Sequence, residues 1–181
     1  MLAVFDTTML TLLLRPSVEP PHDPSTGMPV ALATERVEYL IETLNNEDSR
    51  ILIPSTVWAE FLVAADESAQ NYLDSIADKA NFEIVPFDGI AAAEAALDER
   101  KAKQSGNQKA DLKASRQCLK ADRQVMAVAK VRGVQMVYAA DSDFKKIGAS
   151  MGVPVTLLWD LPPKPSKTPL LDDADKDNGE A

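Results

Sequence analysis

The chain has 181 residues, 45% of them hydrophobic, which is enough for one domain with a sizeable core and excludes general disorder. It has no run of 18 apolar residues to span a membrane, its apolar start lacks the basic leader of a signal peptide, and the lone Cys118 excludes an internal disulfide framework. These features indicate a cytoplasmic protein, and a net charge of −9 argues against a wholly basic, polyanion-binding surface.

Short apolar runs rich in β-branched residues alternate with helical patterns along the chain. We predict strands at 2–6, 50–54, 82–87, 134–140 and 153–159. Apolar positions at three- and four-residue spacing predict helices at 7–15, 32–44, 56–64, 67–79, 89–103, 111–132 and 143–150. Ser55 or Thr56 is expected to cap the third helix, and Gly133 to end the sixth.

This order predicts an α/β fold, a three-layer α/β/α domain with a five-stranded, mainly parallel sheet. We place the domain at residues 1–159. It includes a proline-rich loop at 15–29, because five prolines there block regular structure. Residues 160–181 are rich in proline and acid and are predicted to form a disordered tail.

Several acidic residues fall where the strands of such a sheet end. Asp6 closes the first strand, and Asp141 and Asp143 follow the fourth. Glu60 lies in the first two turns of the helix after the second strand, and Asp122 adjoins an apolar helical stripe. Since functional groups of parallel sheets gather beyond the strand carboxyl ends, these acids are expected to meet there.

Clustered carboxylates repel one another unless a hard cation neutralises them, and Mg²⁺ or Mn²⁺ prefers oxygen ligands. A water molecule bound to such an ion is a good nucleophile for a phosphodiester. Each acid also has an ordinary structural interpretation as a helix cap or a solvated side chain. Only their joint position at one edge favours the metal site, and Asp6 most needs a partner because it directly follows buried residues.

Basic residues are concentrated in one segment. Residues 100–123 carry eight basic and two acidic side chains, whereas residues 1–99 carry four basic and eighteen acidic ones. The segment is either a solvated helix face or a surface for a polyanion. A glycine-rich turn after the first strand, which a dinucleotide-binding domain or a P-loop would need, is missing from DTTML.

The stretches VFDTTML, IPSTVWAEFL, LKADRQVMAVAKVRG and MVYAADSDF, in this order, resemble the PIN-domain ribonucleases, which include VapC-type toxins. The resemblance spans residues 1–158. It implies a metal-dependent ribonuclease with Mg²⁺ or Mn²⁺ as cofactor. It also implies an RNA substrate, a small antitoxin partner and a homodimer. A fold-preserving binding module without activity, acting through a protein or RNA partner, remains the alternative.

The resemblance also assigns roles to individual positions. The catalytic positions of the family fall on Asp6, Glu60, Asp122 and Asp141. The same four residues, together with Asp143, fall on its metal-binding positions. Thr7 and Thr8 match supporting positions. The resemblance also implies that the basic segment binds RNA, through Lys113, Arg116, Lys120 and Arg123. The chain departs from its relatives at Ala139, where they often carry threonine, and in the proline-rich loop and acidic tail.

Overall fold

A computed structural model describes residues 1–65, 68–104 and 116–165, with residues 116 and 117 described by their backbone alone. The five strands are β1 (Leu2–Phe5), β2 (Arg50–Pro54), β3 (Phe82–Val85), β4 (Met136–Ala139) and β5 (Val155–Leu157). The helices of the described residues are α1 (Thr7–Leu14), α2 (Ala33–Asn46), α3 (Ser55–Val63), α4 (Ala69–Ala77), α5 (Gly89–Gln104), α6 (Arg116–Val131), α7 (Asp143–Met151) and the 3₁₀ helix η1 (Leu158–Asp160).

The strands form one sheet in the order β3-β2-β1-β4-β5, and every pairing is parallel. The predicted α/β class and five-stranded parallel sheet are therefore confirmed. The chain builds outward from β1 to β3 on one side and from β4 to β5 on the other, so the strand order reverses between β1 and β4. Ligand sites of open parallel sheets lie outside the strand carboxyl ends at such a switch point.

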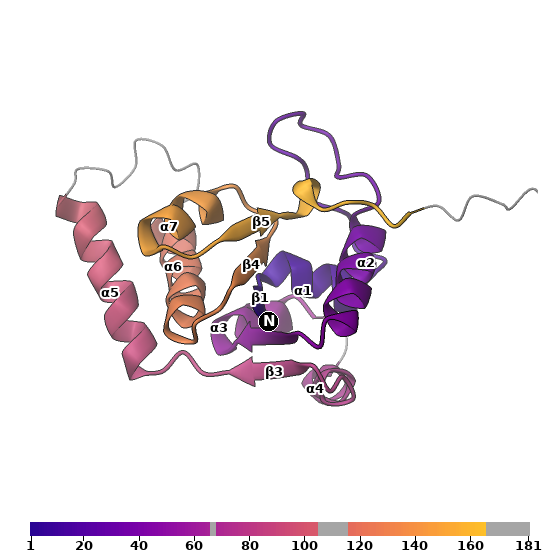
Figure 1. The fold of residues 1–181 in the computed structure, drawn as a ribbon, viewed down its shortest axis with the longest axis horizontal. Helices are drawn as coiled ribbons and strands as arrows, with labels where there is room; N and C mark the ends of the chain where they lie inside the picture. The colour runs from indigo at the N-terminus through magenta and orange to yellow at the C-terminus, as the bar shows by residue number, and fades with distance from the viewer. Residues whose placement is uncertain (66–67, 105–115, 166–181) are drawn as a thin grey trace, which may run out of the picture.

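Helices cover both faces of the sheet because neighbouring strand residues point to opposite sides. On β1, Val4 belongs to a core shared with α3, α6 and α7, whereas Phe5 belongs to a core shared with α1 and α2. Phe5 makes an edge-to-face contact with Tyr138 of β4 on that second side, with ring centroids 5.8 Å apart. Three layers result, as predicted (Figure 1).

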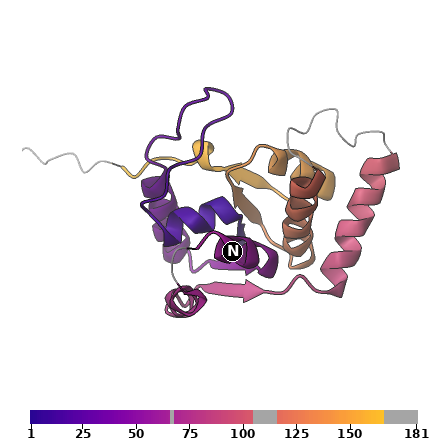
Figure 2. The same cartoon turned by 180° about the vertical axis from the view of Figure 1, so that it is seen from behind.

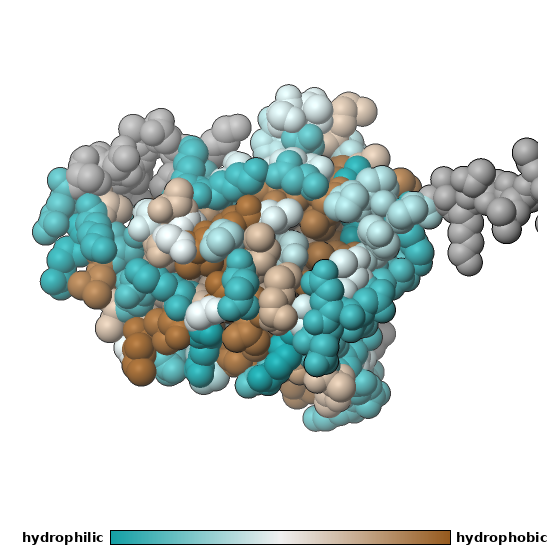
Figure 3. Space-filling model, in the orientation of Figure 1, coloured by the Kyte–Doolittle hydropathy of each residue, from teal (hydrophilic) through white to brown (hydrophobic). Residues whose placement is uncertain are grey.

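The helix pair α5–α6 forms one end of the molecule, while α2 and α4 lie at the opposite end (Figures 1 and 2). Hydrophilic residues dominate the face shown in Figure 3, where apolar residues show only in small patches. In the part of the chain that the structure describes, every helix is too short or too polar to cross a bilayer.

Two local predictions need revision. Pro54, rather than Ser55 or Thr56, occupies the N-cap of α3, and among the described residues no side chain makes a capping hydrogen bond to that helix. The Ser55 hydroxyl instead accepts a hydrogen bond from the backbone N–H of Phe87 at 3.0 Å. The described chain also packs beyond residue 159, since Leu161 is buried in the core beside α2. The tail from residue 166 onward lies outside the described residues, so the predicted disorder there stays a prediction.

Candidate active site

Asp6 joins the carboxyl ends of β1 and β4. It is the N-cap of α1, and its Oδ1 accepts a hydrogen bond from the N–H of Met9 at 2.7 Å. Its Oδ2 accepts from the N–H of Ala140, just past β4, also at 2.7 Å. The residue is 4% exposed. The cap interpretation of Asp6 is thus correct, and the same two bonds hold its carboxylate rigidly at the switch point of the sheet.

Glu60 approaches this point from α3. Its carboxylate accepts a hydrogen bond from the Thr7 hydroxyl at 2.7 Å, which links α3 to the first residue of α1. Glu60 is otherwise exposed, so it stays in contact with solvent. A side chain held at one oxygen and hydrated at the other can adjust its position when a ligand arrives.

Asp122 reaches the site from α6. Residues spaced like Cys118, Asp122 and Val125 share one helix face, and all three line the cavity described below. The Oδ2 atom of Asp122 is shielded from solvent and has no hydrogen-bond partner among the described residues. A carboxylate oxygen that is buried without a hydrogen bond lowers stability, so this atom would gain from a cation or a donor in the cavity.

Asp141 and Asp143 follow β4 and behave differently. Asp141 is exposed and accepts a hydrogen bond from the N–H of Asp143 at 2.8 Å, which shapes the turn into α7. Asp143 is 1% exposed, and its Oδ1 lies 4.0 Å from the Lys146 ammonium group. Asp143 does not line the cavity, as the described residues define it. It therefore acts on the site through its charge.

A cavity of about 180 Å³ brings together four of the five predicted acids. Its lining consists of Asp6, Thr7, Thr8, Thr56, Glu60, Cys118, Ala121, Asp122, Val125, Asp141 and Phe144. Side chains from four helices and two strand ends thus meet at the switch point of the sheet, between the carboxyl ends of β1 and β4. Thr7 and Thr8 lie where the sequence placed them, beside the acids.

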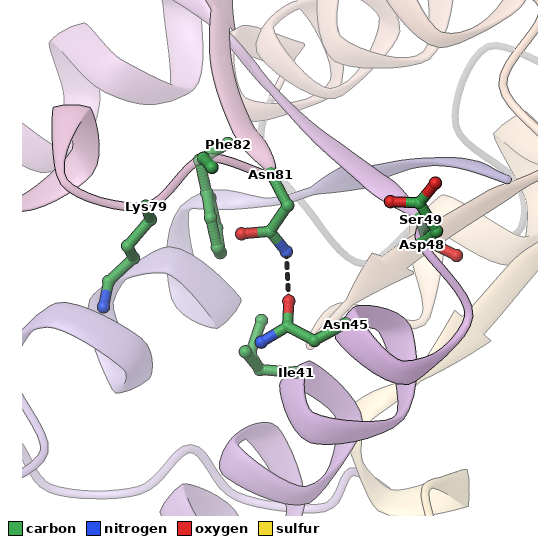
Figure 4. Close-up of a pocket in the computed structure, with 8 residues that line it drawn as sticks. Ile41, Asn45, Asp48, Ser49, Lys79, Asn81 and Phe82 are labelled. Atoms are coloured by element: carbon green, nitrogen blue, oxygen red, sulfur yellow. Dashed lines mark hydrogen bonds between the residues drawn. The ribbon is translucent and has the colours of Figure 1, made fainter.

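A second cavity of about 340 Å³ lies at the opposite, amino-terminal ends of β2 and β3. There the amide of Asn81 donates a hydrogen bond to Asn45, and Lys79 and Phe82 also line the space (Figure 4). Asp48 is the one acid among the described residues that line this space, so the second cavity lacks the charge density of the first. The acidic cavity is the stronger candidate for chemistry.

Burial and mutual repulsion perturb two of the acids. Burial raises the pKa of Asp6 to about 6; the N–H groups of Met9 and Ala140 oppose the rise, and the charges of Asp141 and Glu60 add to it. The pKa of Asp122 rises to about 7, first through burial and then through the charges of Asp141, Asp6, Asp143 and Glu60. Negative charge is therefore crowded here at neutral pH.

The donor chemistry of this cavity fits a hard divalent cation, which prefers carboxylate and water oxygens. The unsatisfied Oδ2 of Asp122 and the raised pKa values of Asp122 and Asp6 are what such an ion would relieve. Among the described residues, however, no three acidic, histidine or cysteine side chains lie close enough to hold a metal as they stand. Binding would therefore require the carboxylates to draw closer once their repulsion is neutralised.

The predicted RNA-binding residues lie in different surroundings. Arg123 is buried, and its Nε donates a hydrogen bond to Asp98 of α5 at 3.0 Å. This bond ties the guanidinium group to the interface between two helices, and the contact of Arg123 with RNA stays a prediction. Lys120 is exposed, but it stands two residues from Asp122 and so points to another side of α6. Lys113 and the side chain of Arg116 lie outside the described residues.

Three polar residues of this region were not predicted from the sequence to lie at or near the site. Asp98 accepts hydrogen bonds from both Arg123 and the Ser150 hydroxyl, the latter at 2.8 Å, and so ties α5 to α6 and α7. Thr56 and Cys118 each lie four residues before an acid of the site, Glu60 and Asp122 respectively, which on a helix places them on the same face. That spacing was visible in the sequence.

The fold and the cavity together define a class: a parallel α/β domain whose switch point carries an acidic pocket built from four separate segments. The sequence profile of the PIN domain matches residues 29–150, about two thirds of the chain. The chain belongs to the PIN domain family. Glu60, Asp122, Asp141 and Asp143 fall within the matched stretch, and Asp6 precedes it.

Solved structures of the same fold include VapBC2 from Rickettsia felis bound to a DNA fragment from its promoter. That structure is 14% identical with a TM-score of 0.58, and the match covers 87% of this chain and 98% of that one. DNA-bound VapBC from Salmonella typhimurium is 17% identical with a TM-score of 0.55, covering 87% and 99%. At these identities the likeness concerns the fold alone. No curated protein matches the sequence.

Proposed function

We propose that this protein is a divalent-metal-dependent endoribonuclease that hydrolyses RNA phosphodiester bonds. The observation that carries the proposal is the cavity shared by Asp6, Glu60, Asp122 and Asp141, in which burial raises the pKa of Asp122 to about 7. These acids come from distant segments of the chain and repel one another, which lowers the stability of the fold. Such an arrangement is typical of functional sites.

Asp6, Asp122, Asp141 and Glu60 would hold the ion, Mg²⁺ or Mn²⁺, with Asp143 adding negative charge behind them. When bound, the ion would supply a water of lowered pKa and would neutralise charge on the phosphate. Asp6 is fixed by its two backbone hydrogen bonds, and Thr7 orients Glu60. Asp141 is exposed at the mouth of the cavity, where a phosphodiester would enter.

An RNA substrate would need cations near this mouth to offset the acidic chain. Lys113, Arg116, Lys120 and Arg123 are the proposed phosphate-binding residues, and the first three are tested together because Arg123 also pairs with Asp98. Replacing these three together with alanine should weaken RNA binding and flatten its dependence on salt. On a single strand the slope should fall by about 0.7 for each phosphate that is no longer neutralised. Fluorescence anisotropy over a salt series measures this slope, and an unchanged slope would exclude these residues.

We further propose that the chain is the toxin of a toxin–antitoxin pair and forms a homodimer. Support comes from its fold, which it shares with the VapBC structures from Rickettsia felis and Salmonella typhimurium. Growth arrest on expression of the chain alone, relieved by Asp6→Asn, is the expected result. The competing proposal, a binding module without activity, predicts no arrest and no cleavage.

The decisive experiment is cleavage of structured RNA by purified protein in Mg²⁺ or Mn²⁺ and in EDTA. Wild-type protein should cleave only with the metal, and Asp6→Asn and Asp122→Asn should each lose activity by about a hundredfold or more. Glu83→Gln is the matched control, because Glu83 pairs with Arg50 at the surface, away from the cavity. Cleavage in EDTA, or full activity in both aspartate variants, would refute the mechanism.

A further inference from the structure

Thr56 is a polar residue of the cavity that the proposed mechanism has not used. It lies in the first turn of α3, directly after the carboxyl end of β2, and one helical turn before Glu60. Both residues line the 180 Å³ cavity. The position of Thr56 therefore follows from the same strand–helix junction that brings Glu60 to the site.

The hydroxyl of Thr56 is buried and unsatisfied. Its Oγ1 is shielded from solvent and has no hydrogen-bond partner among the described residues. The neighbouring Ser55, by contrast, uses its hydroxyl to accept the N–H of Phe87. A buried hydroxyl without a partner lowers stability, so a purely structural position would favour valine, which has nearly the same shape.

The other shielded oxygen without a partner among the described residues belongs to Asp122, which lines the same cavity from α6. Asp122 Oδ2 is equally shielded and without a partner among the described residues, and α3 and α6 pack against each other. The remaining fixed polar groups are already engaged: Asp6 accepts two backbone N–H groups, and Thr7 donates to Glu60. Among the shielded polar atoms of this cavity, the Thr56 hydroxyl and Asp122 Oδ2 are thus the ones without a hydrogen-bond partner among the described residues.

We propose that Thr56 is a positioning residue of this site. When a divalent cation binds, the Thr56 hydroxyl would donate a hydrogen bond to a water molecule of the hydration shell of that cation, beside Asp122. Mg²⁺ keeps several of its waters in protein sites, so a hydroxyl that holds one of them favours binding without touching the ion. The inference rests on the proposed function, since it presupposes a cation in this cavity.

Paired variants at adjacent positions separate this role from a structural one. Thr56→Val should weaken Mg²⁺ or Mn²⁺ binding about tenfold in calorimetry, the scale found for residues that support metal ligands. It should leave the thermal midpoint of the metal-free protein unchanged or higher, because it removes an unsatisfied hydroxyl. Thr56→Ser should bind the metal like wild type. Ser55→Ala should do the opposite of Thr56→Val, lowering the midpoint and sparing metal affinity.

Failure of this inference and failure of the proposed function give different results. If wild type binds the cation, Asp122→Asn does not, and Thr56→Val binds as wild type does, the role of Thr56 is refuted and the metal site stands. A lowered midpoint for metal-free Thr56→Val would likewise assign the hydroxyl a structural role. If wild-type protein binds neither Mg²⁺ nor Mn²⁺, the metal site itself fails, and the Thr56 inference falls with it.

Discussion

Removing the charge of Asp122 should stabilise the metal-free protein, and increasingly so as the pH rises. Burial and the nearby acids raise the pKa of Asp122 from 3.8 to about 7. Between those two values the folded state binds more protons than the unfolded state, so stability must fall as the pH rises through this window. Asn at this position has no such titration. The difference between Asp122→Asn and wild type should therefore be near zero below pH 4 and largest above pH 7.

The magnitude follows from the shift. About three pKa units correspond to roughly 4 kcal/mol, at about 1.4 kcal/mol per unit. Asp122 is only partly buried, and water screens part of the repulsion, so we halve this to about 2 kcal/mol. For a chain of this size, that free energy raises the thermal midpoint by about 4–8 °C.

The assay is thermal or urea unfolding in EDTA from pH 4 to pH 8, for both proteins side by side. Subtracting the two curves removes the titration of the groups that do not interact with Asp122. Added Mg²⁺ should then stabilise wild type at pH 8 and leave Asp122→Asn unaffected, because ligands stabilise only the state that binds them. A difference that stays flat with pH, or an Asp122→Asn protein that is less stable at pH 8, would refute the electrostatic reasoning.

Two further predictions concern the framework around the site. Asp98→Ala should lower the free energy of unfolding, measured by urea titration, by about 3–5 kcal/mol, because it leaves the buried Arg123 guanidinium without its partner. The control is Glu94→Ala, which breaks an ion pair with Lys130 at the surface of the same two helices. It should lower the free energy of unfolding by about 1 kcal/mol or less. Gly148→Ala should destabilise by about 1–3 kcal/mol, because a Cβ there would lie 2.6 Å from the carbonyl oxygen of Val153 and 2.6 Å from a methyl group of Val155, the first residue of β5. Gly89→Ala, with open space around it, should unfold like wild type or slightly later, and equal losses at both glycines would contradict the packing argument.

Local patterns were sufficient to predict the elements. All five strands were predicted within three residues of their observed ends, because each is a short apolar run that ends at or just before Pro or Asp. The amphipathic spacing that predicted a helix at 32–44 lies within α2 (Ala33–Asn46). The errors arose where a side chain had distant competitors. Ser55 was expected to cap α3, and it instead bonds to Phe87, 32 residues away.

The sequence by itself determined that acids follow the strands, since Asp6 and Asp141 come directly after apolar runs whose alternation is a local property. Only the tertiary structure decided which strands are neighbours. The order β3-β2-β1-β4-β5 places Asp6 within hydrogen-bonding distance of Ala140, 134 residues later. Burial is likewise a property of the assembled fold. It raises the pKa of Asp122, and it leaves Asp122 Oδ2 and the Thr56 hydroxyl without a hydrogen-bond partner among the described residues. It also encloses the pair of Arg123 and Asp98. The spacing of residues in the sequence predicts which side chains share a helix face and where strands end. The desolvation of those side chains depends on the other segments that pack against them in the folded protein.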